Sequence, residues 1–400
     1  MLQLQSLRTW TLLTAAVAVL GFASHHVLAD DESRQDSPQP EAQDSDQPEA
    51  EEEEVDPYAV PEEASSEEVS LLIRRFMRMT PESRSPDAFL EHFSKINEST
   101  DKILALELDE ETMLQAVQLK FGVLTLLDRL GVEDAAEKRQ EFAVAISKDE
   151  RPAVAAEGRK LALLGRVQQV PALSGEEQQQ LIDDVAAYLQ DGPIEGDHLG
   201  IAMQTASGLE YSNPELAVDA YNLFAKYIES AEDPQLAAYA ESMRGAARRL
   251  DLPGNEIKIT GTTLDGEPFD IKDLKGKVVL VDFWATWCGY CIEEFPNIRE
   301  NYEKYHDQGF EVVGVNLDEE PETVVEFLEN EPVPWMTLIE PEAENRGVEG
   351  NPNASYYGIT GIPQAILVGK DGKVITIRAR GDELTMHLDE IFKSDDPAGE

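Results

Sequence analysis

The chain contains two cysteines, Cys288 and Cys291, which stand three residues apart in the segment Trp287-Cys288-Gly289-Tyr290-Cys291. An apolar run precedes the pair and a helical pattern follows it, so both thiols are expected on one side of the first turn of a helix. Free amides and the positive end of the helix dipole stabilise a thiolate there. The spacing therefore predicts a dithiol that cycles through a disulfide, with Cys288 as the attacking nucleophile and Cys291 as the resolving thiol.

Two other roles for a cysteine pair fit poorly. A tetrahedral zinc site needs four ligands, and the sequence offers neither a second cysteine pair nor a suitably spaced histidine near His306. A structural disulfide between residues three apart would constrain very little of the unfolded chain. The residues therefore favour thiol-disulfide exchange, and they predict no metal or organic cofactor.

The elements that must hold the pair are indicated by the pattern around it. The period of the apolar residues changes at Pro253-Gly254, and residues 277–285 form a near-continuous apolar run that suits a strand buried on both faces of a parallel sheet. Turn residues at Asp265-Gly266 and Asp371-Gly372 indicate two hairpins. The expected strands are 257–260, 264–269, 277–285, 310–317, 335–339, 365–368 and 374–378, and the expected helices are 288–305, 322–330 and 383–392, the last capped by Asp382.

A different pattern fills residues 69–250, where apolar residues recur at helical spacing. A capping side chain followed by a first-turn proline predicts helix starts at Thr80-Pro81, Asn213-Pro214 and Asp233-Pro234. The region is expected to be all helical, with a last hairpin of the tetratricopeptide kind, although no fixed period precedes it. Two roles stay open for it: a groove that binds a protein partner, or a part that spaces or dimerises the chain.

The charge of the chain is strongly negative. Its 400 residues include 80 Asp and Glu against 33 Lys and Arg, a net charge of −47, which argues against nucleic acid and anionic membranes as partners. Within residues 30–68 there are 17 acidic residues and a single arginine, Arg34. Such a composition predicts a disordered acidic linker that acts as a tether rather than a specific binding segment.

The N-terminus resembles an export signal. Arg8 precedes an uncharged, mostly apolar stretch at 9–29 that ends in Val27-Leu28-Ala29. The densest apolar part is shorter than the roughly 20 residues that span a bilayer, so a cleaved signal peptide is favoured over a retained membrane anchor. The expected organisation is a signal peptide at 1–29, the linker at 30–68, a helical domain at 69–252 and a second domain at 253–400, in a periplasmic or otherwise exported protein.

Two phrases of the second domain resemble the thioredoxin superfamily. They are Val281-Asp282-Phe283-Trp284-Ala285-Thr286-Trp287-Cys288 and Tyr357-Gly358-Ile359-Thr360-Gly361-Ile362-Pro363. The segments Glu293-Glu294-Phe295-Pro296 and Gly314-Val315-Asn316-Leu317-Asp318 are similar to the exported, membrane-associated reductases of the ResA and TlpA type. The resemblance covers about residues 257–392, and it implies an α/β thioredoxin-like fold with a central mixed sheet flanked by helices, preceded here by an all-α helical-hairpin domain.

The resemblance also implies roles for single residues. Pro363 matches the family's cis proline that faces the disulfide, which leaves the backbone of Ile362 free to pair with a substrate strand. Asp282 matches a buried carboxylate behind the second cysteine, and Glu294 matches the carboxylate of the reductases, so either would accept the proton of Cys291. The alternative for Glu294 is an ordinary surface residue of the helix.

Trp287, Gly289 and Tyr290 complete the expected substrate-contacting surface beside the dithiol, where Trp287 would pack and shield rather than catalyse. Tyr290 stands where thioredoxin and the reductases usually carry proline, and Cys-Gly-Tyr-Cys also occurs in periplasmic disulfide isomerases. A peroxidase is disfavoured because the Thr-x-x-Cys setting of the related peroxiredoxins is absent around Cys288.

These observations predict an exported thiol-disulfide oxidoreductase with protein disulfide or dithiol substrates and an upstream membrane or periplasmic electron donor. A reductase of the cytochrome c maturation or redox homeostasis type is favoured. Two alternatives stay open: a disulfide oxidase or isomerase, and a helical scaffold whose partner site is gated by the redox state of the dithiol.

Overall fold

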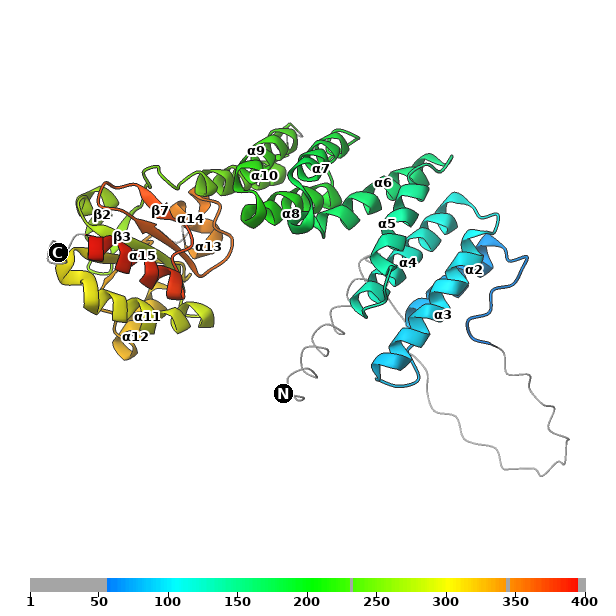
Figure 1. Cartoon of the computed structure of the whole chain (residues 1–400), viewed down its shortest axis with the longest axis horizontal. Coiled ribbons are helices and arrows are strands. Elements are labelled where there is room, and N and C mark those ends of the chain that lie inside the picture. The colour runs from blue at the N-terminus through cyan, green and yellow to red at the C-terminus, as the bar shows by residue number, and fades with distance from the viewer. Residues whose placement is uncertain (1–55, 231–232, 343–345, 395–400) are drawn as a thin grey trace, which may run out of the picture. The chain divides into compact units, whose positions relative to one another are not determined.

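The structure, a computed structural model, describes residues 56–230, 233–342 and 346–394. The chain divides into two compact units, Met1–Arg166 and Val167–Glu400 (Figure 1). The stretch expected to be a signal peptide, and the acidic segment up to residue 55, lie outside the described residues. No helix in the described part of the chain is long and apolar enough to cross a membrane.

The first unit is helical throughout its described part. Its helices are α2 (Ser66–Arg78), α3 (Pro86–Leu104), α4 (Glu110–Arg129), α5 (Ala135–Ile146) and α6 (Pro152–Val167), the last of which ends at the unit boundary. One buried apolar cluster joins α2, α3 and α4, and a second joins α4 to α5 and α6. Helix α4 belongs to both clusters, because apolar residues lie on more than one of its faces.

Residues 56–68, which the composition assigned to a disordered linker, have a defined structure. Tyr58 packs against the first cluster, and its hydroxyl lies 2.7 Å from Nδ1 of His92. Ser65 and Glu68 form a capping box at the start of α2, where acidic side chains also favour the positive end of the helix dipole. The prediction of disorder up to residue 68 is therefore wrong for residues 56–68.

The start of α3 also differs from the expectation at Thr80-Pro81. The helix begins at Pro86, and the hydroxyl of Ser85 accepts a hydrogen bond from the amide of Ala88 at 3.2 Å. The same cap-and-proline pattern recurs there five residues later, and the pattern by itself does not rank the two positions. The predicted starts at Asn213-Pro214 and Asp233-Pro234 are confirmed, since both side chains cap a following helix.

The second unit begins with four helices, α7 (Gly175–Tyr188), α8 (Gly196–Ser212), α9 (Pro214–Glu229) and α10 (Pro234–Leu250). Helices α9 and α10 pack closely on each other, as the hairpin pattern predicted, and α8 packs on α9. Their buried contact residues are largely alanines, with larger side chains such as Tyr221 and Phe224 between them. Small residues let the helix backbones approach closely.

A seven-stranded sheet follows, with strand order β2-β1-β5-β4-β3-β6-β7. Strands β3, β4 and β5 are parallel, whereas β1 and β6 run antiparallel to their neighbours. The expected mixed sheet flanked by helices is confirmed. Its strands are β1 (Thr260–Thr263), β2 (Pro268–Asp270), β3 (Val278–Trp284), β4 (Phe310–Asn316), β5 (Met336–Ile339), β6 (Gln364–Val368) and β7 (Val374–Thr376).

The first strand is displaced from its predicted position at 257–260. The amide of Lys258 donates to the Tyr357 hydroxyl at 2.8 Å, and the amide of Thr260 donates to Oδ1 of Asn353 at 3.1 Å. These backbone groups are therefore satisfied by side chains rather than by a neighbouring strand. The apolar residues of this stretch are buried, but the strand β1 starts only at Thr260.

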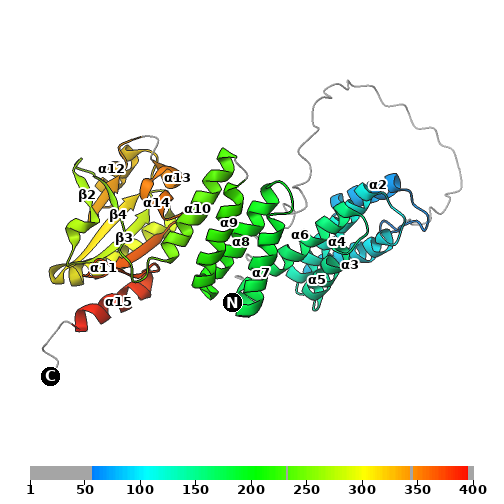
Figure 2. The same ribbon diagram turned by 90° about the horizontal axis from the view of Figure 1, so that it is seen from above.

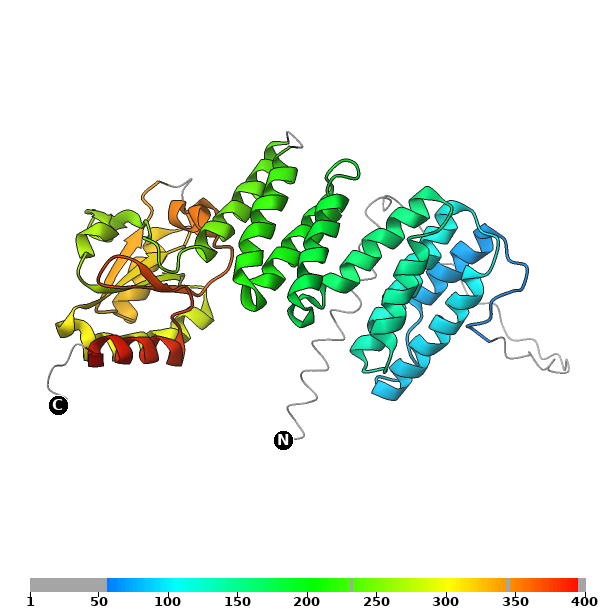
Figure 3. The ribbon, with the colours of Figure 1, turned by 45° about the horizontal axis from the view of Figure 1, so that its top comes forward.

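Helices α11 (Gly289–Tyr305), α12 (Pro321–Asn330), α13 (Gly347–Gly350), α14 (Pro352–Tyr356) and α15 (Gly381–Ser394) surround the sheet. The buried cluster between the sheet, α11, α12 and α15 contains both cysteines. Figure 3 shows α15, in red, along one side of the sheet. Helix α15 begins at Gly381, so Asp382 lies in its first turn and the prediction that Asp382 caps the helix is wrong.

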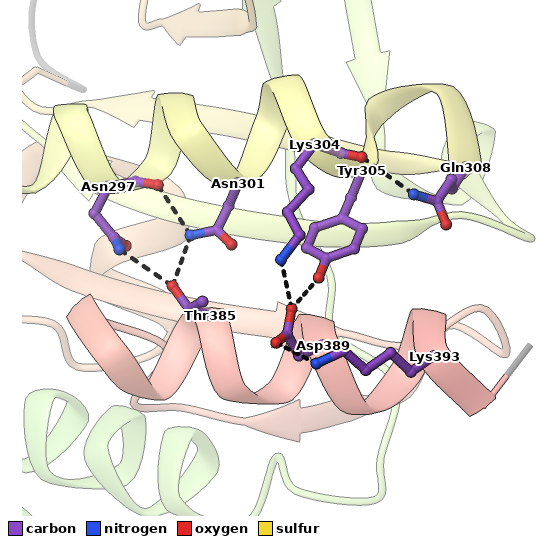
Figure 4. Close-up of polar contacts among 8 residues, drawn as sticks. All are labelled: Asn297, Asn301, Lys304, Tyr305, Gln308, Thr385, Asp389 and Lys393. Carbon is purple, nitrogen blue, oxygen red and sulfur yellow. Dashed lines mark hydrogen bonds and ion pairs between the residues drawn. The ribbon is translucent and has the colours of Figure 1, made fainter. Parts of the chain in front are cut away.

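Polar contacts fix α11 against α15 (Figure 4). The hydroxyl of Thr385 accepts hydrogen bonds from the side-chain amides of Asn297 and Asn301, at 3.2 and 2.9 Å. One turn further along, Asp389 binds the ammonium of Lys304 at 2.8 Å and the Tyr305 hydroxyl. The C-terminal half of the helix that carries the dithiol is thereby held against α15.

Helix α10 packs directly against the sheet domain, residues 260–394, and lies beside α14 (Figure 2). A Cβ atom added to Gly245 would collide with the backbone of Gly358, which has a positive φ of 57°. The guanidinium of Arg248 donates to the carbonyl of Tyr356 at 2.8 Å. Helices α7–α10 thus share a compact unit with the sheet. That residues 253–400 form a domain able to fold without these helices stays a prediction.

Candidate active site

The dithiol lies where the buried strand β3 leads into α11. Cys288 is the N-cap of the helix and Cys291 lies within its first turn, and the two sulfurs form a disulfide. Cys288 is 7% exposed and Cys291 is 1% exposed. The first cysteine is therefore the more accessible of the two, and its sulfur accepts a hydrogen bond from the amide of Cys291 at 3.2 Å, at the positive end of the helix dipole.

The loop that enters the helix is held by a carboxylate from the next strand. Asp318, just beyond β4, accepts hydrogen bonds from the amide of Thr286 at 2.9 Å and from its hydroxyl at 2.6 Å. Asn316 donates a further hydrogen bond to Asp318 at 2.7 Å, and its own side chain accepts from the Asp318 amide. Because Asn316 and Asp318 are buried, these hydrogen bonds fix the approach of the chain to Cys288.

Three predicted substrate-contacting residues surround the more exposed cysteine. The side chains of Trp287 and Tyr290 are 63% and 73% exposed, and Gly289 between them is exposed as well. Large aromatic side chains that face solvent in this way supply contact area to a protein partner at a small entropic cost. Their position is compatible with the predicted contact surface.

The remaining predicted contact residues come from the loop before β6. The peptide bond between Ile362 and Pro363 is cis. Ile362 is half-buried and packs against the cluster that contains Cys288 and Cys291. Ile362 thus packs against the same buried cluster as the dithiol, and the facing of Pro363 toward the disulfide stays a prediction from the resemblance.

Asp282 lies in the middle of β3 and is buried. Burial raises its pKa to about 7, with a further increase from the negative charge of Glu294, while Arg380 acts in the opposite direction. At neutral pH this carboxyl group therefore exchanges its proton readily.

Glu294 is in a different environment, although it lies one helical turn after Cys291. Its carboxylate binds the guanidinium of Arg380 at 3.1 Å and accepts a hydrogen bond from the amide of Gly381 at 3.0 Å. The side chain is 20% exposed. Glu294 thus links α11 to the start of α15 and is more than the free surface residue considered as its alternative.

Sequence reasoning missed two residues of this site. Asp318 was noted as part of a strand end, but nothing local to it indicates a bond to Thr286. Arg380 lies between the last strand and the last helix, and its pairing with Glu294 depends on how α15 folds back on α11. A carboxylate directly after a buried parallel strand was the one available signal for Asp318.

Comparisons with known proteins place the sheet domain in a family. The family model described as Redoxin matches residues 252–390. The thiol-disulfide oxidoreductase ResA of Bacillus thuringiensis subsp. konkukian is 32% identical over 136 residues, which cover 34% of this chain and 73% of that protein. ResA of Halalkalibacterium halodurans is 28% identical over 151 residues, which cover 37% of this chain and 81% of that protein.

A solved structure is also similar to about a third of this chain. The thioredoxin domain of a thiol-disulfide oxidoreductase from Bacteroides vulgatus is 31% identical, with 35% of this chain and 96% of that chain covered and a TM-score of 0.32. A helix-terminal dithiol, a cis proline and a mixed sheet with this strand order are the features that the sheet domain itself supplies. The chain belongs to the TlpA/ResA-like thiol-disulfide oxidoreductases of the thioredoxin superfamily.

Proposed function

We propose that this chain is an exported thiol-disulfide reductase that reduces disulfides of proteins through its Cys-Gly-Tyr-Cys dithiol. Its task would be cytochrome c maturation or the redox homeostasis of an exported compartment. An upstream membrane or periplasmic dithiol donor would return the pair to its reduced form. The apolar stretch at 9–29 supports export.

The proposed reaction has two exchange steps. The thiolate of Cys288 attacks a substrate disulfide, so a mixed disulfide forms and one substrate sulfur leaves as a thiolate that takes up a proton. Cys291 then loses its proton and attacks the sulfur of Cys288, which releases the second substrate sulfur. The substrate gains two electrons, and the enzyme is left with the Cys288–Cys291 disulfide seen in the structure.

The observation that carries this proposal is the unequal placement of the two cysteines. Cys288 caps the helix and is the more exposed, which suits attack on another protein. Cys291 is enclosed one turn later, which suits an internal second step. In the proposed mechanism the ionised carboxylate of Asp282 accepts the proton of Cys291, since its pKa of about 7 matches that task.

The carboxylates also support the reducing direction. Strong oxidants of this superfamily are strong because their reduced, thiolate form is stabilised. Here Glu294 lies one turn from Cys291, and Asp282 lies close enough to Glu294 for the two charges to interact. Negative charge near the dithiol disfavours a thiolate, so the reduced form is less stabilised and donates electrons more readily.

Redox titration of the mature chain against glutathione tests the direction. A potential near about −270 mV, as in thioredoxin, is expected for the reductase, and one between about −120 and −180 mV would instead identify an oxidase or isomerase. Turnover of an insulin disulfide with dithiothreitol tests catalysis itself. A chain that binds partners but does not turn over this substrate would be the redox-gated scaffold.

A further inference from the structure

A pocket of about 390 Å³ lies beside the loop that leads to the cis proline. One wall consists of Gly358, Ile359, Thr360 and Gly361, and the facing wall comes from helices α8, α9 and α10. The helices are held there by the contact of Gly245 with Gly358. A region of the chain outside the family match thus forms a concave surface next to the substrate loop.

The charged residues of this pocket are mainly positive, whereas the chain as a whole is negative. Arg249 and Arg378 line it together with one carboxylate, Glu210. That carboxylate is already engaged, because it accepts hydrogen bonds from Arg249 at 3.1 Å and from the Tyr221 hydroxyl at 2.7 Å. Two arginines against one glutamate leave an excess positive charge, in a chain whose net charge is −47.

Both arginines retain donor groups. Arg378 donates through one Nη2 to the backbone carbonyl of Glu210 at 2.7 Å, and its guanidinium lies 3.9 Å from the centre of the Tyr211 ring. Arg249 uses its Nη2 for Glu210, while its buried Nε has no hydrogen-bond partner among the residues that the structure describes. A carboxylate is the acceptor that two arginines recognise best.

The pocket adjoins, along the chain, the residue expected to pair with a bound substrate. Gly361 lines it, and Ile362 follows directly as the residue whose backbone would pair with the substrate. An extended chain rises about 3.3 Å per residue, and alternate side chains share a face. A side chain two residues from the substrate cysteine therefore comes next to Thr360 and Gly361.

We infer that this pocket binds an acidic side chain of the substrate protein, two residues from the reactive cysteine, so that the helical region takes part in substrate selection. The inference rests on the proposed function, because it concerns substrates of the same dithiol. A preference for an acidic side chain runs opposite to the effect of the net negative charge of the chain, which by itself would attract a basic substrate.

The test measures how fast the reduced full-length chain reduces short peptides. Each peptide has blocked ends and one cysteine, which forms a neutral mixed disulfide with 2-mercaptoethanol. The residue two positions after the cysteine is Glu, Gln or Lys, and a second set varies the position two before it. Each kcat/KM is divided by the rate constant with dithiothreitol, which removes the effect of the charge on the disulfide itself. Glu should exceed Lys about three- to fivefold at one of the two positions, as for a partly exposed ion pair.

Variants assign the preference to the pocket. Arg378→Gln should bring the ratio of Glu to Lys close to one, and Ser207→Asp, which adds a carboxylate at an exposed lining position, should lower it without removing an ion pair. Arg346→Gln is the matched control, because Arg346 lines a separate hollow beside Trp287, and it should keep the preference.

Three results would overturn the inference: a ratio of one or less at both positions, an equal preference at both positions, or an unchanged preference in both pocket variants. Reduction of the peptides without preference would leave the proposed function intact. Failure of the wild-type chain to reduce any peptide would refute the function together with the inference.

Discussion

The carboxyl group of Asp282 and the carboxylate of Glu294 interact electrostatically but have unequal surroundings. Glu294 binds Arg380 and the amide of Gly381, whereas Asp282 is enclosed in the sheet and its pKa rises to about 7. Two like charges at this proximity do not both ionise cheaply. The pair is thus divided into an anchored carboxylate and a carboxyl group that exchanges its proton near neutral pH.

The first prediction follows from that exchangeable proton. Below pH 7 Asp282 is mostly protonated and cannot accept the proton of Cys291, so the resolving rate should rise with pH through about 7 and then level off. Asp282→Asn should slow resolution by about 10² to 10⁴-fold and abolish this inflection. Stopped-flow decay of the mixed disulfide between pH 5.5 and 8.5 measures both. An identical pH profile in the variant would remove Asp282 from the mechanism.

A second prediction uses two substitutions with opposite signs. Glu294 raises the pKa of Asp282 and Arg380 lowers it. Glu294→Gln should therefore move the inflection of the resolving rate to lower pH, and Arg380→Gln should move it to higher pH. The same stopped-flow titration serves both variants. Shifts in the same direction would mean that the substitutions act by disturbing the contact between α11 and α15 instead.

The third prediction concerns stability. Asp282 has a pKa near its ordinary value of about 4 when unfolded and about 7 when folded, so the folded chain binds the proton more tightly. This stabilisation is complete below about pH 4 and is lost as the pH rises through 7, with an upper limit of about 4 kcal/mol. The melting temperature of the oxidised chain should fall between pH 5 and pH 8, and the fall should be smaller in Asp282→Asn.

The order of the cysteines gives a fourth prediction. Cys291→Ser should accumulate mixed disulfides with substrate proteins, because Cys288 attacks and nothing resolves the product. Cys288→Ser should trap none. Non-reducing electrophoresis of each variant after incubation with a disulfide-containing protein shows the difference. Equal trapping by both variants would contradict the assignment.

The fifth prediction tests the contact between α10 and the substrate loop. In Gly245→Ala the new methyl group meets the backbone of Gly358, so the melting temperature and the reductase activity should both fall. Gly200→Ala in α8 is the matched control, since its Cβ would make only an ordinary van der Waals contact with the Gln204 side chain at 3.9 Å, and alanine favours a helix by about 1 kcal/mol. Gly200→Ala should not lower the melting temperature. A Gly245→Ala chain as stable and active as the wild type would show that the contact is dispensable.

Much of the fold was predictable because its signals are local. The apolar run of β3, the cap-and-proline starts of α9 and α10, and the helix-terminal cysteines each lie within a short segment. The contacts of Asp318 with Thr286 and of Gly245 with Gly358 join residues far apart in the sequence. No periodicity or propensity encodes such pairs, so they emerged only from the folded chain.

Local signals also misplaced some elements for physical reasons. Residues 56–65 look like part of an acidic linker, yet a few apolar side chains among the charges, such as Tyr58, find a partly buried site. Residues 257–259 look like a strand, but their backbone groups bond elsewhere. The amide of Lys258 donates to the Tyr357 hydroxyl, and the carbonyl of Ile259 accepts from the amide of Ile271. Composition averages over a segment, whereas folding depends on what each side chain meets.

The close approach of Gly245 to Gly358 limits where this chain can be cut when its sheet domain is fused to another protein. A chimera that joins residues 252–400 to a foreign carrier would expose the face of the loop that α10 covers, and would lose the arginine bond from Arg248 to Tyr356. A crossover near residue 167 would keep helices α7–α10 with their sheet. A fusion of this oxidoreductase to another protein should therefore contain residues 167–400 as one unit.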